Sequence, residues 1–211
     1  MYISPVSIII PNYNSDHILR QSLAEVVTAS NAYSEDCEII VVDDASADGS
    51  VQLISRYFPD IKVVTHTTNK GFAEAVHSGV QMAGHPILIL LNTDVFPGCE
   101  FIAPLIRRFH DPATFSVSPL VTDADGRPRR GSWNRGKLSR GAVRPIKWEL
   151  NQATTLAQRG TGLTSLYAQG GAVALRKEMF LKLNGFLPIY KPFYYEDCDL
   201  GTRAWQRGWK N

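Results

Sequence analysis

A carboxylate follows an apolar run in the first half of this chain. The run 87–91 is Ile-Leu-Ile-Leu-Leu, and Asn92-Thr93-Asp94 comes directly after it. Open α/β sheets bind ligands beyond the carboxyl ends of such buried strands. Asp94 could therefore bind a hard cation such as Mg²⁺ or Mn²⁺ and, through it, a diphosphate. The alternative is that Asp94 only closes a turn.

Two further carboxylates, Asp43 and Asp44, follow the strand-like run 38–42, Glu-Ile-Ile-Val-Val. Adjacent carboxylates repel each other, and burying them is costly unless they have partners. We therefore favour ligand binding over a structural role for this pair. One of the two could accept a hydrogen bond from the imide N–H of uracil or thymine.

Pro11-Asn12-Tyr13 follows the first apolar run, 6–10. Pro11 cannot donate to a strand ladder, so the first strand is predicted to end there. Asn12 and Tyr13 would then lie at the same edge as the carboxylates. Tyr13 could stack on a flat base, although a plain turn explains these residues equally well.

Two other motifs stand at predicted helix starts. Gly71 in Asn69-Lys70-Gly71 would let the backbone approach a ligand, and a helix N-terminus favours anions. A plain glycine-containing helix start is the alternative. Tyr194-Tyr195-Glu196-Asp197 precedes the last helix. A carboxylate there could act as a general base and the aromatic rings could stack on a sugar, or the acids could only complement the helix dipole.

These motifs are separated by alternating strand and helix patterns. Strands are predicted at 6–10, 38–42, 62–65 and 87–91, and helices at 17–29, 48–58 and 71–83. Such β-α-β repeats predict an α/β domain with a mostly parallel central sheet flanked by helices on both faces. Later predictions are a helix at 101–109, strands at 115–120 and 172–175, and helices at 177–183 and 196–206.

Residues 123–162 have no clear periodicity and are rich in Gly and Arg. A stretch of this length without regular structure is unusual inside a compact domain. It could be a solvated flexible loop. It could also bind an acceptor diphosphate or an anionic membrane surface, since the guanidinium fork of Arg suits phosphate.

Composition narrows the class of protein. The 211 residues suit one domain, with 44% hydrophobic and 20% charged residues. The net charge of +2 does not favour nucleic-acid binding. The three cysteines lack metal-type spacing, which indicates a reducing compartment and hence the cytoplasm. The chain has no Walker loop, G-x-G-x-x-G or G-x-S-x-G, which argues against an ATPase, a dinucleotide enzyme and a nucleophile-elbow hydrolase.

Taken together, the motifs resemble the inverting glycosyltransferase family 2, and within it rhamnosyltransferase-like members. The resemblance covers nearly the whole chain and rests on the order and spacing of six segments: 6–14, 40–46, 69–73, 91–94, 170–172 and 195–197. It implies a single domain of the GT-A nucleotide-sugar-binding fold. Asn92 stands where many members have the first Asp of Asp-x-Asp.

The resemblance also implies roles for individual residues. The nucleotide-sugar site would comprise Pro11, Asn12, Tyr13, Asp43, Asp44, Asn69, Gly71, Asn92 and Asp94. Asp94 would bind the divalent cation, Mn²⁺ or Mg²⁺. The acceptor site would comprise Gly170, Gly171 and Tyr195, with Asp197 as general base and Glu196 positioning the acceptor. His77, where many members have Asn, is expected to pack rather than bind a ligand.

The implied activity is inverting transfer of a sugar from a UDP- or dTDP-linked donor to a hydroxyl of a glycan or lipid-linked acceptor in cell-surface polysaccharide assembly. Peripheral contact with the inner face of the cell membrane is a further expectation. We expect residues 1–120 to bind the nucleotide sugar, 121–169 to form a basic variable loop, and 170–211 to supply the acceptor side and the base. Members usually continue with a His-containing segment, so a C-terminally truncated catalytic domain is expected. The alternatives are a non-catalytic nucleotide-sugar-binding domain and a nucleotidyltransferase.

Overall fold

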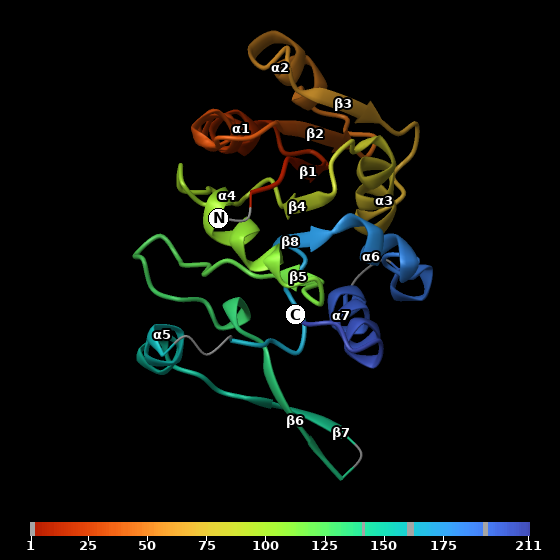
Figure 1. Cartoon of the computed structure of the whole chain (residues 1–211). Coiled ribbons are helices and arrows are strands. Elements are labelled where there is room, and N and C mark those ends of the chain that lie inside the picture. Colours follow the sequence, from red (N-terminus) through yellow and green to blue (C-terminus); the bar gives the residue numbers. More distant parts are fainter. Residues whose placement is uncertain (1–2, 141, 160–162, 192–193) are drawn as a thin grey trace.

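A six-stranded sheet forms the centre of the computed structural model, which describes residues 3–140, 142–159, 163–191 and 194–211 (Figure 1). The strands lie in the order β3-β2-β1-β4-β8-β5. Their bounds are β1 Val6–Asn12, β2 Cys37–Asp43, β3 Lys62–Thr65, β4 Ile87–Leu91, β5 Ser116–Val117 and β8 Ala172–Arg176. β1 to β4 pair in parallel, whereas β8 is antiparallel to both of its neighbours. The predicted α/β fold with a mostly parallel central sheet is confirmed.

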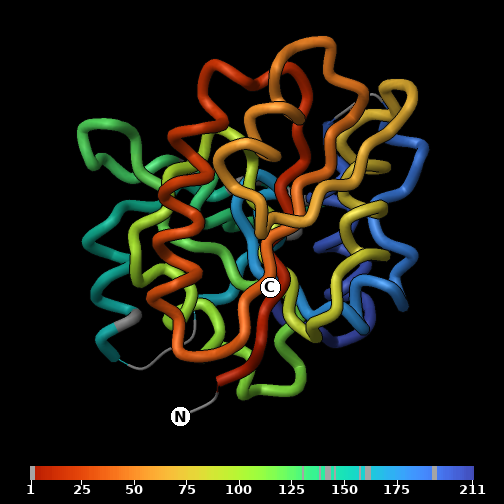
Figure 2. Tube along the Cα trace, turned by 90° about the horizontal axis from the view of Figure 1, so that it is seen from above, coloured from red at the N-terminus to blue at the C-terminus, as the bar shows by residue number. Residues whose placement is uncertain are grey.

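Helices cover both faces of the sheet (Figures 1 and 2). One face packs against α1 Asp16–Ala32, α2 Ser50–Tyr57 and α4 Ile102–Ile106, and the other against α3 Phe72–Met82, α6 Lys177–Lys182 and α7 Glu196–Gln206. Strands buried on both faces must be apolar throughout, which explains the continuous apolar runs. Gly79 lets α3 lie close to β1, because a Cβ there would be 2.4 Å from Cγ2 of Ile9.

The first strand is longer than predicted. β1 continues through Pro11, which pairs with Val42, to Asn12. Pro11 is tolerated because β4 pairs with β1 only as far as Ile9, so no ladder bond is lost on that side. The strand predicted at 115–120 is reduced to β5. The helix predicted at 101–109 is divided into α4 and a 3₁₀ helix, η1 Arg107–His110.

The expectation of no regular structure in residues 123–162 is wrong. The described part contains an antiparallel hairpin, β6 Arg135–Ser139 with β7 Ala142–Ile146, and helix α5 Leu150–Gln158. Both lie outside the central sheet (Figure 1). β6 reads Arg-Gly-Lys-Leu-Ser and β7 reads Ala-Val-Arg-Pro-Ile. Neither strand has a regular apolar alternation, which is why no strand pattern is visible in the sequence. None of the helices in the described ranges is long and apolar enough to cross a membrane.

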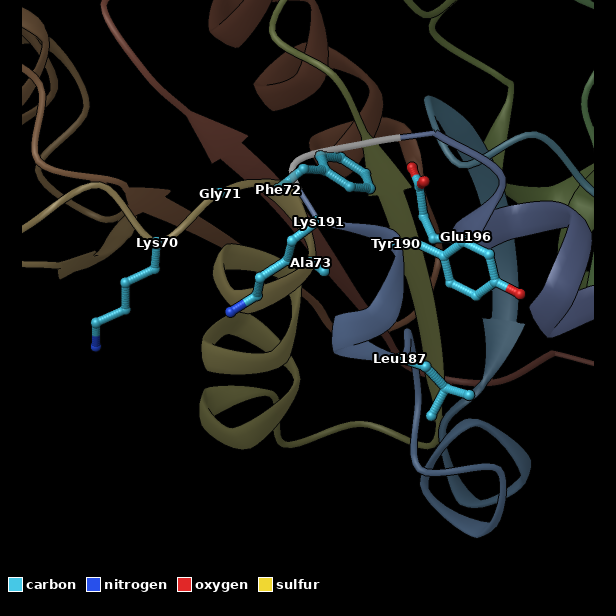
Figure 3. Close-up of a pocket in the computed structure, with 8 residues that line it drawn as sticks. All are labelled: Lys70, Gly71, Phe72, Ala73, Leu187, Tyr190, Lys191 and Glu196. Atoms are coloured by element: carbon cyan, nitrogen blue, oxygen red, sulfur yellow. The ribbon is translucent and has the colours of Figure 1, made fainter.

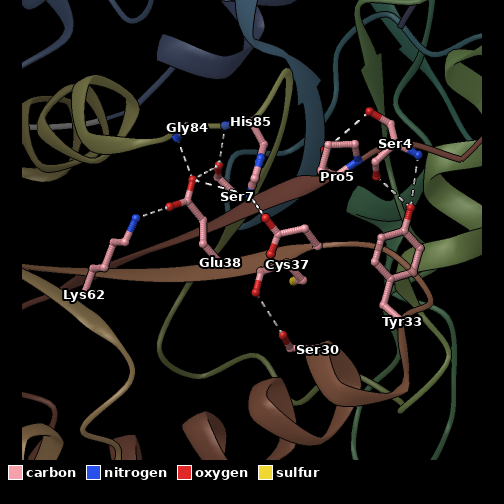
Figure 4. Close-up of polar contacts among 11 residues, drawn as sticks. Ser4, Pro5, Ser7, Ser30, Tyr33, Cys37, Glu38, Lys62, Gly84 and His85 are labelled. Carbon is pink, nitrogen blue, oxygen red and sulfur yellow. Dashed lines mark hydrogen bonds and ion pairs between the residues drawn. The ribbon is translucent and has the colours of Figure 1, made fainter.

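A carboxylate ties three strands together at the amino edge of the sheet (Figure 4). Glu38 accepts hydrogen bonds from the Ser7 hydroxyl and the Gly84 N–H, both at 2.5 Å, and pairs with Lys62 at 2.6 Å. Burial opposes ionisation, but these donors outweigh it and lower the pKa of Glu38 to about 2. This network lies at the end of the strands opposite to Asp43 and Asp94. Its role is therefore to stabilise the sheet and not to bind a ligand at the carboxyl edge.

Candidate active site

The carboxyl ends of β1, β2 and β4 bring several predicted site residues to one edge of the sheet. From β1, strands β2 and β3 lie on one side and β4 on the other, so the strand order reverses between β1 and β4. Open α/β sheets bind ligands at such a switch point. Asn12 is in register with Asp43, and Thr93 after β4 bonds to Ser15 after β1, with 3.2 Å between their hydroxyl oxygens.

Asp43 is held inside this edge by neighbouring loops. Its Oδ1 accepts a hydrogen bond from Asn12 Nδ2 at 2.7 Å, and its Oδ2 accepts one from the Ser46 N–H at 3.0 Å. Asp43 is 3% exposed and Asn12 is 1% exposed. The other side-chain atom of Asn12, Oδ1, is buried without a hydrogen-bond partner among the described residues. Asp43 therefore ties the loop after β2 to the end of β1.

Asp44 fastens the loop that opens α3. Its Oδ1 accepts the Lys70 N–H at 2.9 Å and its Oδ2 accepts the Gly71 N–H at 2.7 Å. Gly71 has φ 88°, in the region that favours glycine, and precedes the first residue of α3. Both Asp43 and Asp44 thus have partners within the protein, so their burial does not by itself require a ligand. Their assignment to the nucleoside pocket stays a prediction.

His66 and Ser78 belong to the same cluster and were missed by the sequence analysis. His66 Nδ1 lies 2.6 Å from Asp44 Oδ1, and His66 Nε2 lies 2.8 Å from Ser78 Oγ. The side chains of Asp44 and His66 are each 5% exposed. His66 follows β3 and Ser78 is in α3, so no local motif joins them. The only signal in the sequence for His66 is that a polar residue directly follows the predicted strand 62–65.

Three segments distant in sequence meet beside β4. The Asn92 N–H donates to the Gly171 carbonyl at 2.9 Å, and a Cβ on Gly171 would lie 3.0 Å from Asn92 Nδ2. The Gly170 N–H donates to Asp197 Oδ2 at 3.4 Å. β8 begins at Ala172, opposite Leu91, so its antiparallel direction brings the two glycines to the carboxyl edge of β4. Asn92, Gly170, Gly171 and Asp197 thus form one continuous wall.

The pKa values of the two carboxylates that begin α7 are both raised. Burial raises the pKa of Asp197, and hydrogen bonds from the N–H groups of Cys198 and Gly170 only partly offset it. Burial also raises the pKa of Glu196, with a further contribution from the nearby Asp197 charge. A raised carboxyl pKa brings a general base closer to neutral operating pH.

Glu196 also lines a small pocket between α3 and α7, with Lys70, Gly71, Phe72 and Tyr190 among its other walls (Figure 3). Its Oε2 is buried and has no hydrogen-bond partner within the described part of the chain. Leaving a buried acceptor unpaired costs free energy, so this oxygen is suited to accept a hydrogen bond from a ligand.

Asp94 is exposed, and among the described residues its carboxylate makes no hydrogen bond or ion pair given by the structure. The described residues also contain no group of three or more His, Cys, Asp or Glu side chains able to enclose a metal ion. A single open carboxylate suits a divalent cation that takes its remaining ligands from water and substrate phosphates. The donor set thus fits a shared cation better than a protein-only metal cage.

The remaining predicted residues line or flank this edge. Tyr13 is 52% exposed and Tyr195 is 73% exposed, so both rings are open to a partner. Asn69 is exposed in the loop fastened by Asp44. His77 has the packing role expected of it: its Nε2 accepts the Phe186 N–H at 3.1 Å, and its ring lies edge-on to Phe180.

Comparison with known proteins places this geometry in context. The chain is 26% identical over 207 residues to the N-acetylglucosaminyl-diphospho-decaprenol L-rhamnosyltransferase of Mycobacterium tuberculosis, covering 87% of this chain and 66% of that protein. It is 28% identical over 141 residues to a dolichol-phosphate mannosyltransferase of Pyrococcus furiosus, covering 65% of this chain and 39% of the relative. The chain thus spans no more than about two thirds of these relatives.

Solved structures share the fold. A Pyrobaculum calidifontis mannosyltransferase in complex with GDP-Man and Mn²⁺ superposes with a TM-score of 0.72 at 20% identity, covering 99% of this chain and 54% of that one. TarS of S. aureus in complex with UDP gives 0.66 at 17% identity, covering 94% and 54%. These neighbours are GT-A glycosyltransferases, which confirms the predicted fold. The model of the family described as Glycosyl transferase family 2 matches residues 7–183, and the chain belongs to that family.

Proposed function

We propose that this domain transfers a sugar from a nucleoside-diphosphate sugar, UDP- or dTDP-linked, to a hydroxyl of a glycan or lipid-linked acceptor, with inversion at the anomeric carbon. The observation that carries the proposal is the wall formed by Asn92, Gly171, Gly170 and Asp197. It joins the carboxyl end of β4, where a diphosphate would lie, to the carboxylate of Asp197. The pKa of this carboxylate is raised by burial.

The donor would occupy the edge between β2 and β4. Asp44 has about four lone-pair positions for donors, of which His66, Lys70 and Gly71 use three. The fourth would accept the imide N–H of a pyrimidine base. Pro11, Tyr13 and Asn69 would line the nucleoside, and Asn92 would contact the ribose or a metal-bound water.

A divalent cation, Mn²⁺ or Mg²⁺, held by Asp94 and the donor phosphates, would neutralise the charge of the leaving nucleoside diphosphate. The choice of Mn²⁺ or Mg²⁺ as this cation is proposed together with the reaction. The Mn²⁺ bound with GDP-Man in the Pyrobaculum calidifontis mannosyltransferase complex supports it.

Asp197 would accept the proton of the acceptor hydroxyl as the oxygen attacks the anomeric carbon. Glu196 would orient the acceptor through its unpaired Oε2, while Gly170 and Gly171 leave room for the sugar. Tyr195 would stack on a sugar ring. A single displacement with the base on the acceptor side inverts the anomeric configuration.

The proposed place of this reaction is the cytoplasm, in cell-surface polysaccharide assembly. The mycobacterial relative, named as a rhamnosyltransferase of N-acetylglucosaminyl-diphospho-decaprenol, supports a lipid-linked acceptor here. Peripheral contact with the inner face of the membrane would bring the domain to it.

The test is a thermal-shift panel of nucleotide sugars with and without Mn²⁺, followed by assays of sugar transfer and donor hydrolysis. A ligand that binds only the folded state raises the melting temperature by mass action. We expect a shift with UDP- or dTDP-sugars that Mn²⁺ enlarges and that Asp94→Asn reduces, with the exposed Asp125→Asn as a matched control. No shift with any nucleotide would contradict the proposal, and binding without turnover would indicate a non-catalytic binding domain. Release of pyrophosphate from a nucleoside triphosphate would indicate a nucleotidyltransferase.

A further inference from the structure

The charge of this chain is concentrated in one segment. Residues 126–148 contain eight lysines and arginines and no aspartate or glutamate. The whole chain has 22 basic and 20 acidic residues, so the remainder carries an excess of acids. A net charge of +2 therefore conceals a strongly basic segment on an otherwise acidic domain.

The β6–β7 hairpin brings like charges face to face. Lys137 is the direct cross-strand partner of Arg144, and both side chains are exposed. Like charges directly opposite each other destabilise an antiparallel pair. The structure gives neither residue an ion pair with any described acid. The same holds for Arg140 in the turn and Lys147 after β7, both exposed.

The base of the hairpin has a different construction. Arg135 lies over the Trp133 ring at 4.7 Å and donates to Gln152 at 3.0 Å. Arg135, at the base of the hairpin, thus has partners within the fold. The four cations at 137–147 are exposed and without an ion pair to a described acid, so they carry charge that the fold does not use. We call them the basic ribbon: Lys137, Arg140, Arg144 and Lys147.

The hairpin is firmly joined to the side of the domain that holds Asp197. Trp133 Nε1 donates to the Thr164 carbonyl at 3.0 Å, and the Leu166 N–H donates to the Asn134 carbonyl at 2.6 Å. Trp205 of α7 in turn donates to the Ser165 carbonyl at 3.0 Å. From this base the hairpin extends away from the central sheet (Figure 1).

We propose that the basic ribbon docks the protein on an anionic phospholipid surface. Its charges are spread along two strands and a turn, an arrangement that matches an extended array of headgroups better than one discrete anion. The surface potential of an anionic leaflet attracts each nearby Lys or Arg. Docking would present the α7 side of the domain to the bilayer. The inference rests on the charges of the ribbon and does not require the transfer reaction.

The test is co-sedimentation of the 211-residue chain with vesicles of phosphatidylcholine alone or with phosphatidylglycerol added. We expect binding to the anionic vesicles only, with loss at high salt because surface charges are screened. Lys137→Gln with Arg144→Gln should weaken the partition coefficient about 30-fold, on the order of fivefold for each charge removed. Relief of their repulsion means that the variant should melt no lower than the wild type.

The matched control is Arg107→Gln with Arg108→Gln, which removes two exposed cations from η1. If docking is specific to the ribbon, we expect this variant to bind within about twofold of the wild type. The reason is that the effect of about fivefold per charge on the partition coefficient applies only to cations near the membrane surface. Equal losses in the two variants, equal binding to neutral vesicles, or no binding to any vesicle would overturn the proposal. Binding of inorganic diphosphate through Lys137 and Arg144 without vesicle binding would also overturn it, in favour of a soluble anion.

Discussion

His66 Nδ1 and Asp44 Oδ1 lie 2.6 Å apart, and both side chains are 5% exposed. The other nitrogen of the ring, Nε2, lies 2.8 Å from Ser78 Oγ, so both ring nitrogens have partners. His66 thereby joins the end of β3 to the loop after β2 and to α3. Asp44 is held in place before any ligand arrives.

Removing His66 should therefore affect both stability and ligand binding. His66→Ala leaves a buried carboxylate short of one donor, which should lower the free energy of unfolding by about 2–3 kcal/mol. Ser78→Ala removes only the outer hydrogen bond and should cost about 1 kcal/mol. Urea denaturation measures both. Nucleotide affinity should fall more in the His66 variant, and equal affinity in the two variants would show that His66 does not position Asp44 for a ligand.

Gly171→Ala should impair the proposed transfer with little effect on stability. Its Cβ would press on Asn92 Nδ2 at 3.0 Å and displace that amide. Small displacements of positioning groups can lower rates by up to about 100-fold, so we expect a loss of about tenfold in kcat/KM. Gly98→Ala is the matched control, since a Cβ there meets nothing within 4 Å. Equal activities of the two variants would mean that Asn92 does not contact the donor.

Asp197→Asn should slow turnover by orders of magnitude without destabilising the fold. Loss of a general base typically costs about 10²–10⁴ in rate. Burial raises the pKa of Asp197, so its ionised form is disfavoured in the folded state. A carboxyl with a raised folded pKa contributes stability below its unfolded value and loses it as pH rises through the folded value. At neutral pH the neutral Asn should therefore melt no lower than Asp.

The pH profile provides an independent check on Asp197. The transfer rate of the wild type should rise with pH through a limb above the ordinary carboxyl value of about 3.9. A limb at or below that value would contradict the assignment of Asp197 as the base. An Asp197→Asn variant that transfers sugar at the wild-type rate would contradict it as well.

Glu38 should make the fold sensitive to acid. Its pKa of about 2 lies below the ordinary value, so its contribution is complete at neutral pH and is lost as pH falls from about 4.3 towards 2. Glu38→Gln should cost about 1–3 kcal/mol at pH 7, and the difference from wild type should shrink in acid. Urea denaturation at several pH values measures this. Exposed Glu25→Gln should have no such effect, and a pH-independent cost at Glu38 would show that its charge is not what stabilises the sheet.

Much of the fold was predictable because its signals are local. The short strand predicted at 62–65 and the apolar run at 87–91 coincide with β3 and β4, and the last helix has the predicted bounds. The hairpin in residues 135–146 was not predictable in this way. It is held by cross-strand bonds and by anchors such as Trp133 to Thr164, which leave no periodic trace in the sequence.

The sequence by itself determined which polar residues stand at the carboxyl ends of the strands. Asn12, Asp43 and Asn92 follow apolar runs, and parallel strands place such residues at one edge. Only the tertiary structure decided what each of them contacts. Asp44 is surrounded by His66, Lys70 and Gly71, while Asp94 remains open. The physical reason is that hydrogen bonds depend on atomic distances between segments that the chain order leaves far apart.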